Sequence, residues 1–323
     1  MSRVLVTGTS GFIASHLARL LVERGDTVLG LDKREPLIAP AGWSHVTCDL
    51  LNASALALAV ARFAPDTVLH LAARTDLDET KNLSGYAANI EGVRNLATAI
   101  RACGSVQRTV CTSSQLVNRI GYAPISDSDY SPATLYGASK VETERIWRAE
   151  AGGGADWTIV RPTTIWGPRM NPHYLRFFRM IAAGRYRHLS GGPRFKSYGY
   201  VGNTVWEYFR IAIASRDQVH GKVFYLADYE PIALERWADE FQLQLRAPPI
   251  RSIPLVLARA AAAIGDGINA VGFKRFPLNS FRLHNVLTCY TSPLETLECV
   301  VGPLPYSMAA GVAETCVWLR EVL

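Results

Sequence analysis

Two side chains with complementary chemistry lie four positions apart, at Tyr136 and Lys140. They open a helical pattern that continues to Trp147, and residues four apart lie on one face of a helix, one above the other. A phenol with an ordinary pKa of about 10 is a poor base at neutral pH, and a nearby ammonium lowers that pKa. The pair is therefore suited to proton transfer, although an ordinary surface helix would also explain it.

The elements around this pair alternate short β-branched runs with helical patterns over the first two thirds of the chain. That alternation predicts an α/β fold of the Rossmann type, a doubly wound parallel sheet with helices on both faces. We expect strands at residues 3–7, 27–31, 45–47, 67–71, 108–112, 157–160 and 222–226, and helices at 12–24, 53–64, 84–103 and 135–151. Beyond Arg161-Pro162 the helices shorten, which indicates a smaller, mostly helical C-terminal domain.

A glycine-rich turn follows the first strand directly, with Gly8, Gly11 and Ala14 in a Gly-x-x-Gly-x-x-Ala spacing. Backbone N–H groups and the helix dipole at such a turn hold a pyrophosphate, so the turn predicts dinucleotide binding. The second strand ends at Asp32, about twenty residues further on, where a carboxylate binds both ribose hydroxyls and favours NAD. Lys33 and Arg34 follow and could instead reach a 2′-phosphate, so NADP stays open.

Composition restricts the class of protein. The chain has 323 residues, 49% hydrophobic and 19% charged, which is typical of a globular protein. Its formal net charge of +6 is spread without a basic run, so we expect no nucleic-acid partner. Six cysteines and seven histidines have no metal-ligand spacing, which predicts free thiols, a reducing cytoplasmic location and no metal. The apolar segment 254–272 is too interrupted to span a membrane and predicts one or two packed helices.

Motifs in a fixed order along more than half of the chain resemble the extended short-chain dehydrogenase/reductases, within them the NAD-dependent nucleotide-sugar epimerase/dehydratase family. The motifs are Thr7-Gly8 with Gly11-Phe12-Ile13, Asp32, Asp49-Leu50, His70-Leu71-Ala72-Ala73, Asn89 with Gly92 and Asn95-Leu96, Ser113-Ser114, Tyr136-Gly137 with Ser139-Lys140, and Arg161-Pro162 with Gly167-Pro168. The resemblance implies an NAD-binding Rossmann domain at 1–168 plus about 196–228, and a substrate-binding domain at 169–195 and 229–323.

The resemblance also implies roles for single residues. Tyr136 would be the acid/base, Lys140 its partner and ribose ligand, and Ser114 the hydroxyl that orients the reacting oxygen. The residues implied in cofactor binding are Gly8, Ser10, Gly11, Phe12, Ile13, Asp32, Asp49, Leu50, Leu71, Ala72, Ala73, Asn89, Tyr136, Lys140, Pro162 and Thr163. Those implied in substrate binding are Thr75, Gln115, Thr164 and Lys196.

Several positions depart from the family pattern. Dehydratases place an Asp-Glu pair after the catalytic hydroxyl, whereas this chain has Gln115 and Leu116, which cannot drive loss of water. Thr164 replaces a usual asparagine. Lys196 replaces the usual phosphate-binding arginine and lacks its bidentate fork.

The function expected is therefore an NAD-dependent nucleotide-sugar epimerase that acts through a transient ketosugar. The main alternative is an NAD(P)H-dependent ketoreductase or dehydrogenase with net cofactor turnover, and a non-enzymatic dinucleotide sensor is a weaker one. Relatives dimerise through the two helices at 84–103 and 135–151, so we expect a homodimer. An apolar stripe on the first of these helices is wide enough for core and interface together: Ile90, Val93, Leu96, Ala97 and Ile100.

Overall fold

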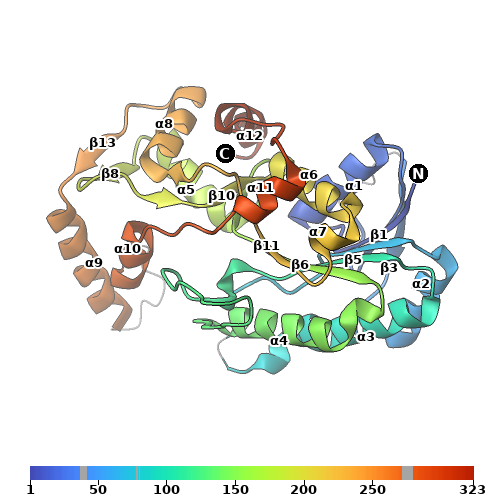
Figure 1. The fold of residues 1–323 in the computed structure, drawn as a ribbon. Coiled ribbons are helices and arrows are strands. Elements are labelled where there is room, and N and C mark those ends of the chain that lie inside the picture. Colours follow the sequence, from blue (N-terminus) through green and yellow to red (C-terminus); the bar gives the residue numbers. More distant parts are fainter. Residues whose placement is uncertain (37–41, 78, 80, 271–278) are drawn as a thin grey trace. The chain divides into compact units, whose positions relative to one another are not determined.

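The computed structural model describes residues 1–36, 42–77, 79, 81–270 and 279–323 (Figure 1). They group into two compact units. Unit 1 comprises residues 1–165, 199–228 and 293–305, and unit 2 comprises residues 166–198, 229–292 and 306–323. Residues 293–305, which we expected in the substrate-binding domain, belong to unit 1, and residues 166–168 and 196–198, which we expected in the NAD-binding domain, belong to unit 2.

A seven-stranded parallel sheet forms the centre of unit 1, in the order β11-β6-β5-β4-β1-β2-β3. Its strands are β1 (Arg3–Thr7), β2 (Thr27–Asp32), β3 (Ser44–Thr47), β4 (Thr67–His70), β5 (Arg108–Thr112), β6 (Asp156–Pro162) and β11 (Val223–Leu226). The chain runs outward from β1 to β3 and then returns to β4 on the other side of β1. This reversal makes the carboxyl ends of β1 and β4 the crevice where open α/β sheets bind their ligands.

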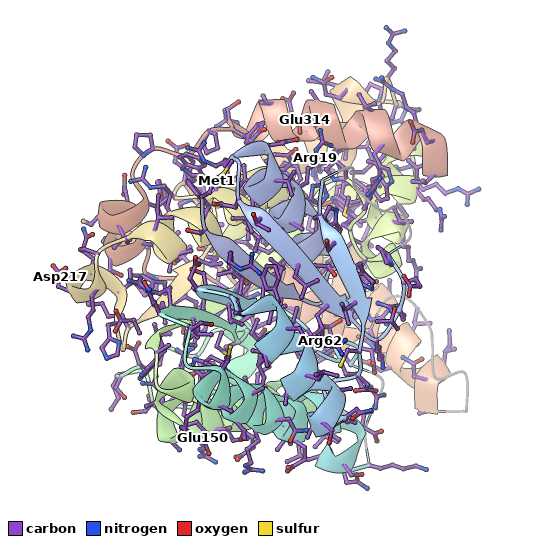
Figure 2. All side chains as sticks on the ribbon, turned by 90° about the vertical axis from the view of Figure 1, so that its right-hand side faces the viewer. Met1, Arg19, Arg62, Glu150, Asp217 and Glu314 are labelled. Atoms are coloured by element: carbon purple, nitrogen blue, oxygen red, sulfur yellow. The ribbon has the colours of Figure 1, made fainter. Side chains whose placement is uncertain are left out.

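Helices cover both faces of this sheet, as expected for a doubly wound fold (Figure 1). One layer contains α2 (Ala53–Phe63), α3 (Ala87–Cys103) and α4 (Leu135–Ala149), and the other contains α1 (Phe12–Glu23), α6 (Val201–Ile213) and α11 (Glu295–Val301). A short helix, α7 (Arg216–Val219), precedes β11. Charged side chains such as Arg19 and Arg62 project outward from α1 and α2 (Figure 2).

The expected strands and helices of unit 1 are present, with small shifts at their ends. The helix expected at 84–103 is a 3-10 turn (Leu83–Tyr86) followed by α3, and the helix expected at 135–151 ends at Ala149. The apolar stripe of α3 lies in the core: Val93, Leu96, Ala97 and Ile100 are at most 2% exposed. The core alone thus accounts for that stripe, and the homodimer stays a prediction.

Unit 2 is mostly helical. Its helices are α5 (Pro172–Ala182), α8 (Leu234–Gln244), α9 (Leu255–Ala270), α10 (Ser280–Leu287) and α12 (Met308–Val322). Short strands β8 (Arg187–Leu189), β9 (Phe195–Lys196), β12 (Ile232–Ala233) and β13 (Arg251–Ile253) pair two by two, β12 with β9 and β13 with β8. Two further short strands, β7 (Thr164–Trp166) and β10 (Tyr198–Tyr200), lie where the chain passes between the units. Aromatic rings around Trp237, including Phe178 and Phe241, form the core of unit 2.

All six cysteines are free. Cys48, Cys111 and Cys316 are buried, whereas Cys289 and Cys299 are exposed. Within the described part of the chain no cluster of side chains could hold a metal ion, and no helix there is long and apolar enough to cross a bilayer. The helix expected in segment 254–272 is α9, and residues 271–272 lie outside the described residues.

Candidate active site

The turn after β1 has a backbone that only glycine adopts easily. Gly8 has φ +84° and donates its N–H to the Leu31 carbonyl at 2.7 Å, and Gly11 donates to the Gly8 carbonyl at 2.8 Å. A Cβ at Gly8 would lie 2.7 Å from the Ala72 nitrogen. The backbone of the turn therefore packs closely on the end of β4 and leads into the N-terminus of α1, a geometry that fits a bound pyrophosphate.

Asp32 closes this turn on one side. Its carboxylate accepts hydrogen bonds from the backbone N–H groups of Ser10 and Arg34, both at 3.1 Å, and the residue is 8% exposed. The Arg34 side chain is 68% exposed, with its Nε 3.9 Å from Asp32. A buried negative charge at this position matches the hydroxyls of an unphosphorylated ribose and repels a 2′-phosphate.

Thr7 and His70 tie the glycine turn to the end of β4. The Thr7 hydroxyl oxygen accepts the N–H groups of Leu71 and Ala72, both at 3.1 Å, and lies 2.8 Å from His70 Nδ1. Because that oxygen already accepts two hydrogen bonds, we assign its proton to His70 Nδ1, which places the histidine proton on Nε2. Burial, with a smaller contribution from Lys140, lowers the pKa of His70 to about 3, so the ring is neutral. The histidine is thus a packed, neutral residue at the end of β4.

Helix α4 carries Tyr136 and Lys140 and begins at a defined place. The Thr134 side chain accepts the Gly137 N–H at 3.0 Å and caps the helix. A Cβ at Gly137 would lie 2.2 Å from the Leu116 carbonyl oxygen, so the first turn of α4 packs directly on the 3-10 turn Gln115–Val117. This close approach brings the segment of Ser114 against the segment of Tyr136.

The three predicted catalytic groups are all nearly buried. Ser114 is 8% exposed, and its oxygen accepts the Leu116 N–H at 3.1 Å, which leaves its own proton available. Tyr136 is 8% exposed, and its ring lies 6.1 Å from that of Tyr86. The Lys140 ammonium donates to the Thr112 carbonyl at 2.8 Å, and burial lowers the pKa of Lys140 to about 8. The arrangement therefore places a phenol, an ammonium and a hydroxyl at the carboxyl end of β5.

A buried ion pair, one helical turn after Lys140 on α4, was not predicted from the sequence. Glu144 and Arg161 have fully buried side chains and form two hydrogen bonds of 2.8 Å. Glu144 also accepts the hydroxyl of Ser113 at 2.5 Å and that of Tyr130 at 2.9 Å. The Ser113 side chain therefore bonds a carboxylate and not the backbone. The pair joins α4 to β5 and β6, so it holds the helix that carries Tyr136 in place.

One signal in the sequence could have pointed to Glu144. It stands four residues after Lys140 and eight after Tyr136, on the same face of α4. A carboxylate on a buried helix face requires a partner. The partner, Arg161, is 17 positions away, and only the fold brings the two together.

The remaining predicted cofactor residues lie in unit 1. Asn89 is buried and bonds both backbone groups of Arg74, at 2.8 and 3.0 Å, and the Ser139 hydroxyl at 2.9 Å. Asp49 is exposed at the end of β3, and the Thr163 hydroxyl donates to the Leu226 carbonyl at 3.0 Å. The other members of the predicted set lie at or shortly after the carboxyl ends of β1, β3, β4 and β6: Phe12, Ile13, Leu50, Ala73 and Pro162.

The predicted substrate residues differ in placement. Thr75 is exposed, Gln115 and Thr164 are half-buried, and all three belong to unit 1. The side-chain oxygen of Gln115 is buried and has no hydrogen-bond partner among the described residues. Lys196 belongs to unit 2, where its ammonium donates to the carbonyls of Asn285 at 2.8 Å and Thr288 at 2.6 Å.

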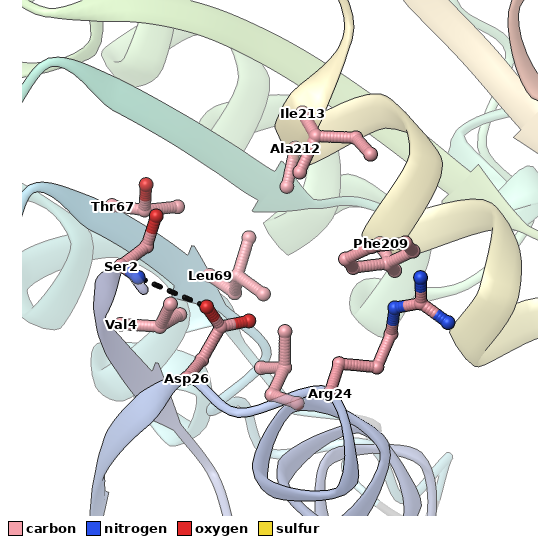
Figure 3. Close-up of a pocket in the computed structure, with 10 residues that line it drawn as sticks. Ser2, Val4, Arg24, Asp26, Thr67, Leu69, Phe209, Ala212 and Ile213 are labelled. Atoms are coloured by element: carbon pink, nitrogen blue, oxygen red, sulfur yellow. Dashed lines mark hydrogen bonds between the residues drawn. The ribbon is translucent and has the colours of Figure 1, made fainter.

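A pocket of about 410 Å³ lies at the opposite ends of the strands (Figure 3). Ser2 and Thr67, at the amino ends of β1 and β4, line it together with Arg24 and Phe209. The Arg24 guanidinium stacks on the Phe209 ring at 4.5 Å. Because Gly8 and Ser114 follow the carboxyl ends of their strands, this pocket is not part of the candidate site.

Comparison with known proteins identifies the chain. The model of the NAD dependent epimerase/dehydratase family matches residues 4–227. A 3-beta-hydroxysteroid dehydrogenase of Mycolicibacterium neoaurum is 31% identical over 254 residues, which cover 74% of this chain and 69% of that protein. N-acetyl-alpha-D-glucosaminyl-diphospho-ditrans,octacis-undecaprenol 4-epimerase of Escherichia coli O157:H7 is 26% identical over 323 residues, 97% of this chain and 93% of that protein.

The fold is shared with solved structures. The UDP-glucuronic acid 4-epimerase from Bacillus cereus in complex with NAD has a TM-score of 0.75 at 16% identity and covers 99% of both chains. The glycine cradle at Gly8 and the buried Asp32 fit the same cofactor. The chain is therefore an enzyme of the extended short-chain dehydrogenase/reductase type that uses NAD, and it belongs to the NAD dependent epimerase/dehydratase family.

Proposed function

We propose that the chain is a nucleotide-sugar epimerase that oxidises its substrate transiently and then reduces it again at the same site. The observation that carries this proposal is the close contact at Gly137, where the first turn of α4 packs directly on the 3-10 turn that follows Ser114. It supports a single working group made of Ser114, Tyr136 and Lys140 at the carboxyl end of β5.

Each residue of this group has a distinct task in the proposal. Tyr136, as its phenolate, accepts the proton of a sugar hydroxyl and later returns it. Lys140 stabilises the phenolate by its positive charge, and Ser114 donates a hydrogen bond to the reacting oxygen as charge develops there. NAD, when bound, supplies the acceptance and return of hydride.

The cofactor would be held by the residues around the crevice of unit 1. The turn from Gly8 to Ile13 would bind the pyrophosphate, Asp32 the adenosine ribose and Asp49 the adenine. The segment 71–73 and Asn89 would support the cofactor along the sheet edge, and Pro162 and Thr163 would flank the nicotinamide end.

Gln115 supports a polar substrate. Buried polar atoms in folded proteins are almost always satisfied, and its side-chain oxygen has no partner among the described residues. A sugar hydroxyl would satisfy it. Thr75, Thr164 and Lys196 would complete the contacts, with Lys196 directed at a phosphate of the substrate.

The same positions argue against loss of water. An elimination needs an acid and a base beside the catalytic hydroxyl, and here Gln115 and Leu116 occupy those positions. An amide and an alkyl group do not transfer protons, so the proposed site moves a proton only between Tyr136 and the substrate.

One observation favours a second function. The dehydrogenase relative from Mycolicibacterium neoaurum is 31% identical over 74% of this chain, and its name describes net oxidation of a hydroxyl. The epimerase relative from Escherichia coli matches 97% of this chain, including unit 2. The wider coverage makes the epimerase our first proposal and the dehydrogenase the alternative.

The test is to incubate the purified protein with a panel of nucleotide sugars and analyse the products by chromatography. A parallel set contains a sugar linked by a diphosphate to a short polyprenol. An epimer formed by the wild type, and not by Tyr136→Phe, would support the proposal. A ketone product with accumulating reduced nicotinamide would support the dehydrogenase, and full activity of Tyr136→Phe would exclude both.

A further inference from the structure

Helix α9 has an apolar face that the described residues do not cover. Its buried face packs Ala258 and Ala262 against Leu283 of α10. The opposite face would carry charged and polar side chains on an ordinary surface helix. In α9 that face is apolar throughout, and its members, which we call the exposed α9 face, are Val256, Leu257, Ala260, Ala263, Ile264 and Gly267.

The exposed fractions show how unusual this face is. Val256 is 73% exposed, Leu257 is 60% exposed and Ile264 is 64% exposed. On the neighbouring α10, Phe281 is 68% exposed. Large exposed apolar patches on a protein surface are typical of sites that bind another protein, a membrane or a ligand.

The dimensions of α9 indicate how it would meet a lipid bilayer. At 16 residues it is about 24 Å long, which is short of the ~30 Å hydrocarbon core that a spanning helix must cross. A helix that presents an apolar face can instead lie along the surface of a bilayer, with that face below the headgroups.

Charge favours an anionic surface. Among the described residues of 251–292 there are three arginines, Arg251, Arg259 and Arg282, against the single carboxylate of Asp266. All four residues are exposed; Arg259 and Asp266 lie on α9 itself, at the side of its apolar face, whereas Arg251 lies on β13 and Arg282 on α10. Arginines beside an apolar helix face attract acidic headgroups.

We propose that α9 and α10 dock unit 2 onto an anionic bilayer surface. The purpose of this contact rests on the proposed function. The epimerase relative that matches 97% of this chain is named for a sugar linked by a diphosphate to undecaprenol, which is a membrane lipid. A substrate of that class would be reached at the bilayer. The docking itself depends only on the exposed α9 face and on Arg251, Arg259 and Arg282.

The experiment is flotation of the purified full chain with vesicles. One set contains phosphatidylglycerol with phosphatidylethanolamine, and the other contains phosphatidylcholine alone. We expect the wild type to float with the anionic vesicles and to be released by high salt. Ile264→Glu should weaken the partitioning at least about tenfold, since it places a charge where an apolar side chain is buried in lipid.

A matched control separates this face from apolar exposure in general. Leu243 on α8 also belongs to unit 2 and is 65% exposed, close to Ile264, and Leu243→Glu should float like the wild type. Circular dichroism of both variants checks that they fold. Equal flotation of the two variants, or no flotation of the wild type with anionic vesicles, would overturn the proposal.

Two further outcomes are decisive. Light scattering could show that the wild type is a dimer and that Ile264→Glu is a monomer. That result would assign the face to a second copy of the chain and refute docking.

Turnover of a soluble nucleotide sugar without vesicles should be the same in the wild type and in Ile264→Glu. Failure of docking with intact turnover would leave the proposed function in place, and docking without turnover on any sugar would refute the function alone.

Discussion

Replacing Lys140 by methionine should abolish turnover and, at the same time, stabilise the folded protein. Lys140 is 2% exposed, and its ammonium donates a hydrogen bond to the Thr112 carbonyl at 2.8 Å. Methionine has a similar length and no charge, so it can occupy the same space without the cost of burying an ammonium. In the proposed mechanism Lys140 serves the chemistry at the expense of stability.

The size of the effect follows from the pKa. Burial lowers the pKa of Lys140 from 10.5 to about 8. At about 1.4 kcal/mol per pKa unit, the charged form costs the folded chain roughly 3 kcal/mol. Loss of the hydrogen bond to Thr112 offsets roughly 1 to 2 kcal/mol of this. We expect the unfolding free energy of Lys140→Met to exceed that of the wild type by roughly 1 to 2 kcal/mol near neutral pH.

The pH dependence has a definite sign. Below about pH 8, Lys140 is protonated in both the folded and the unfolded chain, so its full cost is present. Between about 8 and 10.5 only the unfolded chain keeps the proton, and the wild type gains stability as the pH rises. The advantage of Lys140→Met should therefore shrink over that range.

The assay is urea unfolding of the cofactor-free protein, followed by circular dichroism at about pH 7 and about pH 10. Lys222→Met serves as the control, because Lys222 is exposed and its replacement should leave the unfolding free energy nearly unchanged at both values. A Lys140→Met protein that is less stable than the wild type near neutral pH, or whose advantage does not shrink, would refute the reasoning.

Three other substitutions test the site. Glu144→Gln leaves the buried Arg161 guanidinium without its counter-ion and should lower the unfolding free energy by roughly 3 to 5 kcal/mol, measured by urea unfolding. Gly8→Ala must adopt φ +84° with a Cβ 2.7 Å from the Ala72 nitrogen, so the affinity for NAD should fall at least about tenfold in a fluorescence titration. Asp32→Ser removes the carboxylate from the ribose position and should weaken NAD about tenfold while improving NADP, measured by titrating both cofactors.

Matched controls exist for two of these changes. Glu142 pairs with Arg145 on the surface of the same helix, and Glu142→Gln should change the unfolding free energy by at most about 0.5 kcal/mol. A Cβ at Gly267 of α9 would meet nothing within 4 Å, so Gly267→Ala should stabilise by about 0.5 to 1 kcal/mol and leave NAD binding unchanged. Equal costs for Glu142→Gln and Glu144→Gln, wild-type NAD affinity in Gly8→Ala, or an unchanged cofactor preference in Asp32→Ser would contradict the respective prediction.

Features encoded locally could be predicted from the sequence. Strand β1 and the helix after it follow from a β-branched run that ends at Gly8, and the cap of α4 follows from Thr134 three residues before Gly137. The four-residue spacing of Tyr136 and Lys140 is enough to predict that both lie on one face of a helix. Such patterns depend on neighbours within one or two turns, so they are visible before the fold is known.

Features that depend on distant contacts could not be predicted. The partner of Glu144 is Arg161 on β6, and Tyr208 on α6 lies 2.7 Å from the Thr112 hydroxyl across 96 positions. The apolar pattern of 254–272 predicted packed helices, and α9 does pack on one face. Its other face has no partner among the described residues, which periodicity alone cannot reveal.

The central claim is that Tyr136 moves a proton in a reaction that leaves the cofactor unchanged. The most direct measurement is the number of sugar molecules converted per NAD, with the cofactor at a small fraction of the substrate concentration. An epimerase converts many sugar molecules per NAD, and Tyr136→Phe converts none. A reaction of the wild type that stops after one equivalent of sugar per NAD, with reduced nicotinamide accumulating, would contradict the account.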